Sequence, residues 1–255
     1  MRNLSKALLL AGVLTASLAR AQAPAPAAAA EPASSLAFKL SLYSEYEYRG
    51  ISQTSEKPAG QVNIDYSHPS GFYLGTFVSN IKWLKDTAQV GGFSTSAKIE
   101  WDIFGGYKFE PIKDVTVDVG YLRYEYPSSG SFNPKPNTDE IYVGASYGPV
   151  SVKYSYSIND TFGVPNSDGS DFLEANLAYP LTEKLQLTGT VAHQKFKRNN
   201  SLSYTVYKIG LVYDLGAGWN VGGYFKDTDA DSALYTYKGK DWGKSRAVGF
   251  VSYTF

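Results

Sequence analysis

The sequence has no cysteine, one methionine and two histidines, and its basic and acidic residues balance at 24 each. The lack of cysteine excludes a disulfide framework and a thiolate metal site. The balanced charge leaves no basic surplus of the kind that nucleic-acid-binding proteins carry, so we expect no nucleic-acid partner. No Gly-rich phosphate loop lies between a strand and a helix, which leaves nucleotide chemistry unsupported. We expect no cofactor, no metal and no enzymatic activity.

Long hydrophobic runs are also missing, apart from one at residues 8–18. This run is too short to cross a membrane as a helix. It follows the basic residues Arg2 and Lys6 and precedes Ala19-Arg20-Ala21, a small-x-small cleavage pattern. The arrangement predicts a cleaved signal peptide over 1–21, followed by a flexible Ala/Pro-rich lead-in over 22–35. Any membrane insertion of the remaining chain must use strands.

The rest of the chain alternates apolar and polar residues. The last stretch, 245–255, places Ala247, Gly249, Val251, Tyr253 and Phe255 on one face. A period of two is typical of a β-strand, and about ten residues suffice for a tilted strand to cross a bilayer. Similar alternation predicts eleven further strands, at about 37–48, 61–66, 72–80, 98–109, 115–121, 141–147, 150–158, 173–179, 185–191, 205–213 and 219–225.

The connections between these predicted strands alternate in length. Short turns are expected at 67–71, 110–114, 148–149, 180–184 and 214–218, whereas most of the other connections are long and polar. Outer-membrane barrels place short turns in the periplasm and longer loops outside, and a soluble β-sandwich gives no reason for such alternation. We therefore predict an all-β fold over 36–255, a transmembrane antiparallel up-and-down barrel of about twelve strands. Its periplasmic aromatic girdle would contain Tyr66, Phe72, Tyr107, Phe109, Tyr147, Tyr179, Tyr213, Trp219 and Phe255.

The polar face of the predicted strands carries charges of both signs. A charged side chain facing lipid is costly, roughly 2–4 kcal/mol for Lys or Arg at the midplane, so these residues should face the lumen. They either pair across a narrow interior as a plug or line a water-filled constriction that selects solutes by charge. The candidates for the lumen and its constriction are Glu45, Glu47, Arg49, Asp65, Lys98, Glu100, Asp102, Lys108, Asp118, Lys153, Glu174, Lys208 and Arg246.

Two stretches resemble known proteins. Tyr48-Arg49-Gly50-Ile51-Ser52-Gln53, Pro58-Ala59, the turn at Gly71 and Phe72-Tyr73-x-Gly75 are similar to the N-terminal hallmark of the TorF-type porins, a proteobacterial family long described as conserved hypothetical. The last strand resembles the C-terminal strand of bacterial outer-membrane barrels, in which Tyr253 and Phe255 would form the insertion signal for the barrel assembly machinery. The resemblance implies a barrel in the outer membrane of a Gram-negative bacterium, with presumed channel activity.

Three functions are consistent with such a barrel. The first is a porin-like channel for passive diffusion of small hydrophilic solutes or ions, surrounded by outer-membrane lipid. The second is a structural or adhesive barrel with a plugged interior that acts through its extracellular loops, notably 195–200 and 226–244. The third is a barrel enzyme that uses His193 as a base, although no motif specifies a nucleophile. Asp227, Asp229 and Asp231 are spaced to offer oxygens to Ca²⁺, but the rest of an EF-type loop is missing and a solvated acidic loop is favoured.

Overall fold

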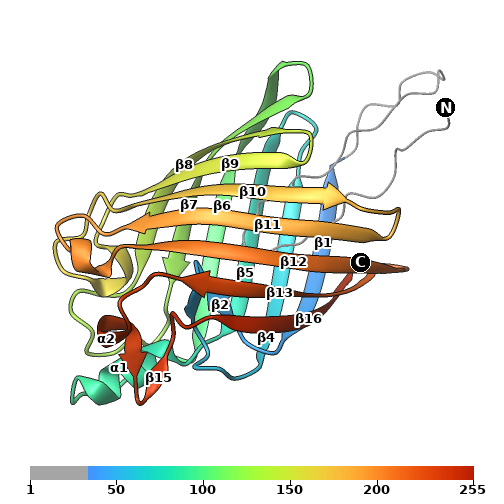
Figure 1. Cartoon of the computed structure of the whole chain (residues 1–255). Helices are drawn as coiled ribbons and strands as arrows, with labels where there is room; N and C mark the ends of the chain where they lie inside the picture. Colours follow the sequence, from blue (N-terminus) through green and yellow to red (C-terminus); the bar gives the residue numbers. More distant parts are fainter. Residues whose placement is uncertain (1–33) are drawn as a thin grey trace, which may run out of the picture.

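The computed structural model describes residues 34–255, and within them twelve antiparallel strands close into a barrel (Figure 1). The predicted signal peptide lies outside the described residues, as does all of the predicted lead-in except Ser34 and Ser35. The barrel strands are β1 (Ser35–Tyr43), β4 (Ala59–Ser67), β5 (Phe72–Asn80), β6 (Ile99–Ile112), β7 (Val115–Glu125), β8 (Thr138–Tyr147), β9 (Val150–Ser157), β10 (Asp171–Pro180), β11 (Leu185–Lys195), β12 (Tyr204–Gly216), β13 (Trp219–Thr228) and β16 (Arg246–Thr254).

Neighbouring strands pair in chain order, and β1 closes the ring by pairing with both β4 and β16. Closure leaves no strand of the described barrel with an unpaired edge, as a sheet surrounded by hydrocarbon requires. The C-terminal Phe255 completes the seam, because its backbone N–H and C=O both bond to Phe38 at 3.0 Å. The predicted twelve-strand antiparallel barrel is confirmed.

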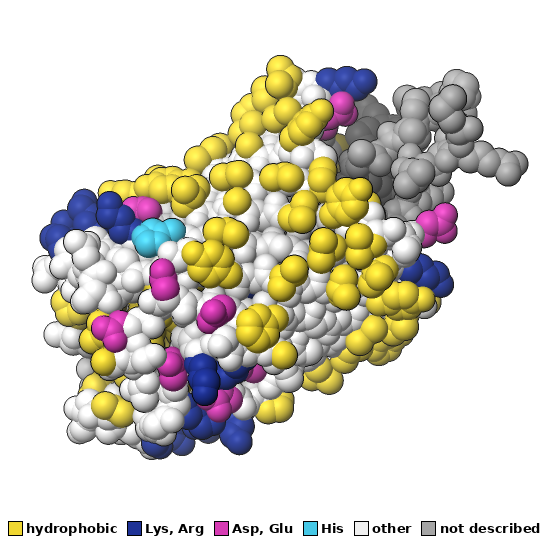
Figure 2. Space-filling model, viewed as in Figure 1, with side chains coloured by type: hydrophobic (Ala, Val, Ile, Leu, Met, Phe, Trp, Pro, Cys, Tyr) yellow, Lys and Arg dark blue, Asp and Glu magenta, His cyan; other side chains and the backbone are white. Residues whose placement is uncertain are grey.

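Alternation along each strand separates the two faces of the wall. In β1, Lys39, Ser41 and Tyr43 are buried inside, whereas Leu40 and Leu42 are exposed outside. The same pattern places large exposed apolar side chains on the outside of the other strands, such as Leu74, Val191, Ile209 and Phe225. Figure 2 shows this apolar cover on the barrel wall, with charged side chains near the two ends and more of them at one end than at the other.

The connections alternate in length as predicted. Long segments join the strands at one end of the barrel, and turns of a few residues join them at the other, where the C-terminus also lies (Figure 1). The long segments contain α1 (Trp83–Val90), α2 (Ser232–Tyr235), the 3-10 turns η1 (Thr161–Gly163) and η2 (Asn200–Leu202), and the short hairpin β14 (Thr236–Tyr237) and β15 (Lys240–Asp241). None of the helices in residues 34–255 is long and apolar enough to cross a membrane.

The predicted girdle lies near the short-turn end. Eight of its nine members are large side chains exposed on the outer surface, and Tyr107 is partly buried against Phe72, with ring centroids 4.8 Å apart. At the seam, Phe255 stacks on Phe38 at 5.5 Å and on Tyr253 at 5.6 Å. Aromatic rings at this level suit a membrane–water interface.

The first strand is shorter than predicted. β1 ends at Tyr43, whereas the sequence pattern extended it to Tyr48. Within residues 44–58, predicted partly as strand and partly as an outer loop, 45–55 instead turn into the barrel and contain the hairpin β2 (Glu47–Tyr48) and β3 (Ile51–Ser52), whereas Ser44 and 56–58 stay exposed. Tyr46 and Tyr48, predicted to face outward, are 1% and 8% exposed inside the barrel. The alternation of apolar and polar residues continues in the sequence past the end of β1. A hairpin alternates its side chains as a wall strand does, so this pattern did not reveal the turn after Tyr43.

Candidate channel constriction

The segment 45–55, here called the inner hairpin, is buried at every residue. Its turn is made by Arg49 at φ 48° and Gly50 at φ 83°. Both values lie in the left-handed region that favours glycine. Gly50 is also required by space, because a Cβ there would lie 2.5 Å from Thr228 Cγ2 on β13 and 3.1 Å from Val206 on β12. The tip therefore fits against β12 and β13 only with glycine.

Arg49, at the tip, reaches strands on the opposite side of the barrel. Its guanidinium donates to Glu140 on β8 through Nη1–Oε1 at 2.9 Å and Nη2–Oε2 at 2.7 Å, and to Gln194 Oε1 on β11 at 2.9 Å. Its Cζ lies 4.2 Å from the centre of the Phe172 ring, a cation–π distance. Burial lowers the pKa of Arg49, but the Glu140 carboxylate and the hydroxyls of Tyr48 and Tyr124 together raise it more, so that its net pKa is well above the ordinary value.

Two more ion pairs fix the sides of the inner hairpin. Glu47 pairs with Lys208 on β12 at 3.4 Å, and Glu45 pairs with Arg246 on β16 at 3.2 Å. Lys226 on β13, fully buried, donates to the backbone oxygen of Gly50 at 2.8 Å. The hairpin is thus held by charged side chains from several strands around the ring. Such contacts specify its position more than they add stability, because each buried charge also loses its hydration.

Tyrosines form a second layer of contacts against β6 and β7. Tyr46 on the hairpin and Tyr126 both donate to the carboxylate of Glu100, the latter at 2.8 Å. The hydroxyls of Tyr48 and Tyr124 contact each other, and their rings pack edge to face at 5.5 Å. The half of the barrel nearer the long loops is therefore filled.

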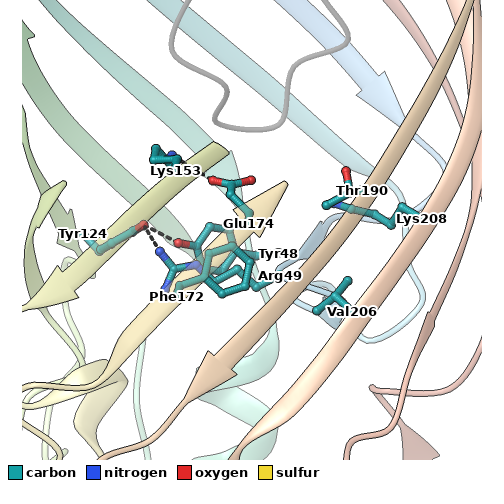
Figure 3. A pocket seen from close by; sticks show the side chains of 9 residues that line it. All are labelled: Tyr48, Arg49, Tyr124, Lys153, Phe172, Glu174, Thr190, Val206 and Lys208. Carbon is teal, nitrogen blue, oxygen red and sulfur yellow. Dashed lines mark hydrogen bonds and ion pairs between the residues drawn. The ribbon is translucent and has the colours of Figure 1, made fainter. Parts of the chain in front are cut away.

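Below the hairpin tip, the wall from β9 to β12 remains polar and partly exposed. Lys153 pairs with Glu174 at 3.1 Å, and Thr190 donates to Asn176 Oδ1 at 2.7 Å. A small cavity lies here, lined by Arg49, Phe172, Lys153, Glu174, Thr190 and Lys208 among others (Figure 3). Its volume is about 30 Å³, enough for a few water molecules. Arg49, at the hairpin tip, therefore forms part of the lining of this cavity.

Nearer the short turns, the opposite wall carries a second polar group. Tyr73 donates to Asp118 at 2.6 Å and also contacts the hydroxyl of Tyr142. Lys108 Nζ lies 4.7 Å from the centre of the Tyr73 ring, and Asp65 interacts with both Lys108 and Lys39. Charges of both signs thus face the interior at this level.

The structure places the thirteen predicted lumen residues in distinct positions. Glu45, Glu47 and Arg49 lie on the inner hairpin and not on the wall. The wall residues Asp65, Lys108, Asp118, Lys153, Glu174 and Lys208 are partly buried and face inward, Glu100 and Asp102 are fully buried beside the hairpin, and Arg246 begins β16. Lys98 differs, because it precedes β6 in the 81–98 segment and its side chain is exposed.

Several contact residues were missed by the sequence pattern. Lys39, Glu140, Gln194 and Lys226 share the inward parity of their strands and are 7%, 1%, 1% and 0% exposed. Lys39 lies on the inward row of the predicted strand 37–48 but was not among the lumen candidates. Alternation extended by one residue for Glu140 and Lys226, and by three for Gln194, would have found the others. Phe172 and Tyr124 gave no such indication, because apolar and aromatic residues on the inner face of a barrel contradict the pattern that defines that face.

Neither a catalytic site around His193 nor a Ca²⁺ site at Asp227, Asp229 and Asp231 is formed in the described residues. His193 is exposed on the outside of β11, with Nδ1 3.3 Å from Thr205 Oγ1. Asp227, Asp229 and Asp231 each accept a hydrogen bond from a nearby backbone N–H, from Thr228, Thr205 and Ala233 respectively. Within residues 34–255, no three His, Asp or Glu side chains are grouped so as to hold a metal ion.

The closed ring, its apolar exterior and its polar interior define a membrane-spanning antiparallel β-barrel. Residues 27–255 match the profile of a family described as "Bacterial protein of unknown function (Gcw_chp)", and the chain belongs to that family. This match does not carry the narrower TorF-type name, which stays a prediction. A search of curated protein sequences finds no match.

Solved structures of porins share the fold. A structure named "KdgM porin" matches with a TM-score of 0.54 and 10% identity, covering 88% of this chain and 99% of that one. A "NanC porin" structure matches with a TM-score of 0.57 and 12% identity, covering 87% and 99%. A third, "KdgM porin in complex with disordered oligogalacturonate", has a TM-score of 0.54 and 11% identity, with 88% and 99% covered. These names describe porins and not enzymes, and at such identities the likeness concerns the fold.

Proposed function

We propose that this protein is a porin-like channel of the bacterial outer membrane, through which small hydrophilic solutes or ions diffuse passively along a narrow charged lumen. The observation that carries the proposal is the polar inner wall of β9 to β12, which stays partly exposed in a closed barrel with an apolar exterior. A barrel with a purely structural interior has no need to leave Lys153, Glu174 and Lys208 partly exposed to water. The fold shared with porins supports the same conclusion.

The number of strands in the barrel limits the size of the solutes that such a channel can pass. Eight strands leave an interior filled by side chains and sixteen leave an open channel, so twelve strands leave a narrow one. In this conformation the cavity at the hairpin tip, about 30 Å³, has room for a few water molecules. Passage of a larger solute therefore requires displacement of the inner hairpin. Because the lumen carries both signs of charge, we expect weak ion selectivity.

Single-channel recording tests the proposal. The refolded chain is compared in a planar bilayer, under a salt gradient, with a variant in which residues 46–52 are replaced by a Gly/Ser segment of equal length. We expect discrete steps from both, with larger or more frequent openings in the variant, because its tip no longer meets Glu140 and Gln194. Silence from both, with folding shown by heat-modifiable migration on a gel, would argue against a channel.

The filled outer half favours one alternative, a plugged barrel that acts through its extracellular loops. Here the three charged hairpin residues would serve to close the barrel permanently. The loops 195–200 and 226–244 would then carry the activity, with β14, β15 and α2 in the second of them. Deletion of both loops should abolish adhesion to a cell surface while leaving the barrel folded. Adhesion that persists without them would remove this alternative.

A further inference from the structure

Asp102 is a buried acid whose carboxylate has no hydrogen-bond donor within residues 34–255. It lies on β6 opposite Phe77 of β5 and Tyr124 of β7. Its side chain faces inward, is 0% exposed, and neither carboxylate oxygen has a hydrogen-bond partner among residues 34–255. An ionised carboxylate in such surroundings is costly, and a buried acid ordinarily becomes neutral instead.

The two neighbouring acids are satisfied, which singles out Asp102. Glu140 receives both N–H groups of the Arg49 guanidinium. Glu100 accepts phenol hydrogen bonds from Tyr46 and Tyr126, one on each oxygen. Both therefore have donors on both oxygens, whereas Asp102 has no donor within the described chain to stabilise a negative charge. Two carboxylates so close also oppose a third charge.

The charged and titratable groups around Asp102 belong to its own strand, to β7, to β8 and to the inner hairpin. The charged groups that act on it are Glu100 on its own strand, Glu140 on β8 and Arg49 on the inner hairpin. Four tyrosines interact with it electrostatically, Tyr46 and Tyr48 from the hairpin and Tyr124 and Tyr126 from β7 and the segment after it. Three of these groups, Tyr46, Tyr48 and Arg49, leave if the hairpin leaves. Water then reaches Asp102.

We propose that Asp102 is a proton-binding site over which the inner hairpin closes, so that the plugged barrel holds one proton more than the unplugged barrel. This proposal rests on the proposed function in one respect, that the hairpin closes the channel. Asp102 is neutral beneath the hairpin and ionises when water replaces it. The barrel thus couples its opening to the release of a proton.

Proton linkage gives the direction in which pH shifts the equilibrium between the plugged and the unplugged barrel. The state with more bound protons is favoured as pH falls, so acid favours the plugged barrel and rising pH favours withdrawal of the hairpin. Between about pH 6 and 8, exposed carboxyl groups are ionised. In this range one proton changes the ratio of unplugged to plugged barrel by up to about tenfold per pH unit.

A cysteine reporter measures withdrawal without any conductance. The chain has no cysteine, so Ser52→Cys places a single thiol on the hairpin at a fully buried position. Its rate of reaction with a maleimide is divided by that of Ser201→Cys, an exposed position in η2, which removes the pH dependence of the thiol itself. We expect this ratio to rise with pH from about 6 to 8 in the folded barrel.

Asp102→Asn provides the decisive variant, since it cannot release the proton. In this background we expect the rate ratio to become independent of pH. Asp114→Asn is the matched control, because it makes the same chemical change in the exposed turn after β6, at φ 65°, where asparagine fits. The control should keep the wild-type slope. A flat wild-type profile, or an unchanged slope in Asp102→Asn, would overturn the proposal.

A second measurement needs no substitution at Asp102. The infrared carbonyl stretch of a protonated carboxyl group should appear at about pH 7 in the wild-type barrel, where exposed carboxyl groups are ionised, and be lost when residues 46–52 are replaced by Gly/Ser. Its absence from the wild type, or its presence in both proteins, would overturn the proposal. A bilayer that stays silent would bear on channel function alone, because neither the thiol reaction nor the infrared band requires conduction.

Discussion

The guanidinium of Arg49 lies against both carboxylate oxygens of Glu140, at 2.9 and 2.7 Å, and joins two residues 91 positions apart in the chain. The side chains of the two are 6% and 1% exposed. Because a planar guanidinium and a carboxylate match in a two-pronged contact, the pair fixes the direction as well as the distance of the hairpin tip. The tip can leave the wall only if both charges are rehydrated together.

Glu140→Gln should therefore destabilise the barrel, because it leaves the Arg49 charge buried without its partner. Breaking a buried ion pair costs about 3–5 kcal/mol. The free energy of unfolding by urea in lipid vesicles measures the effect. The matched control is Asp168→Asn, which breaks the exposed pair with Arg198 at 54% and 48% exposure and should cost no more than about 1 kcal/mol. Equal losses in both variants would mean that Glu140 does not anchor the tip.

Gly50→Ala should displace the inner hairpin. The new methyl group would meet Thr228 and Val206 in a backbone conformation that alanine resists. We expect the Ser52→Cys reporter to react roughly tenfold faster or more, since strain of about 1–3 kcal/mol acts on the closed form. Gly239→Ala is the control, because its φ is 73° but no atom lies within 4 Å of its Cβ position. Similar rates in the two variants would show that backbone strain and not the wall contact governs the hairpin.

Arg49→Glu should shift the reversal potential under a salt gradient toward cation selectivity, because it replaces a positive charge beside the cavity inside the barrel by a negative one. Lys82→Glu makes the same change of charge in an outer segment, where the Lys82 side chain is 41% exposed. Exposed charges beyond a Debye length are largely screened, so its effect should be smaller. Equal small shifts would place Arg49 outside the conduction path.

Ile209→Lys should destabilise the barrel in lipid. Ile209 is 60% exposed on the outside near the middle of β12, and a lysine at the bilayer midplane costs roughly 2–4 kcal/mol. Thr188→Lys, on the inner face of neighbouring β11, introduces the same side chain into the polar lumen and should cost less. Unfolding in vesicles compares them. A larger loss for Thr188→Lys would contradict the assignment of the two faces.

Phe255→Ala should slow assembly of the barrel by the insertion machinery more than it lowers stability. Phe255 is 60% exposed and stacks on Phe38 at the seam. Phe72→Ala is the control, because Phe72 is 63% exposed and also packs against a neighbouring ring, that of Tyr107. Folding rates are measured in vesicles with and without the purified machinery. If both variants lose the same rate enhancement, the terminal aromatic is not the recognised feature.

Most of the wall could be predicted from the sequence. Residues that face lipid must be apolar, whereas residues that face the lumen can be polar. The two faces of β1 can therefore be assigned from the sequence, with Leu40 and Leu42 outside and Lys39 and Ser41 inside. Turn chemistry then sets the strand order, because each short connection forces its two strands to be neighbours. The errors lie where the periodic pattern passes a strand end, as at Lys98 and at Tyr46.

The inner hairpin could not be predicted in this way. Glu45, Glu47 and Arg49 continue the alternation of β1, and nothing local distinguishes a strand that goes on from a hairpin that turns inward. The distinction depends on the partners Arg246, Lys208 and Glu140, which lie on three strands distant in the chain. Only closure of the barrel brings these three partners into contact with the inner hairpin.

The sequence by itself therefore determined a membrane-spanning barrel, its two faces and its two ends, because the cost of exposing polar groups to lipid acts on each residue locally. The tertiary structure alone decided that the barrel is filled at one end, which charges pair there, and that the Asp102 carboxylate has no donor within the described chain. Those outcomes depend on distances between residues that meet only across the lumen, and no local pattern contains them.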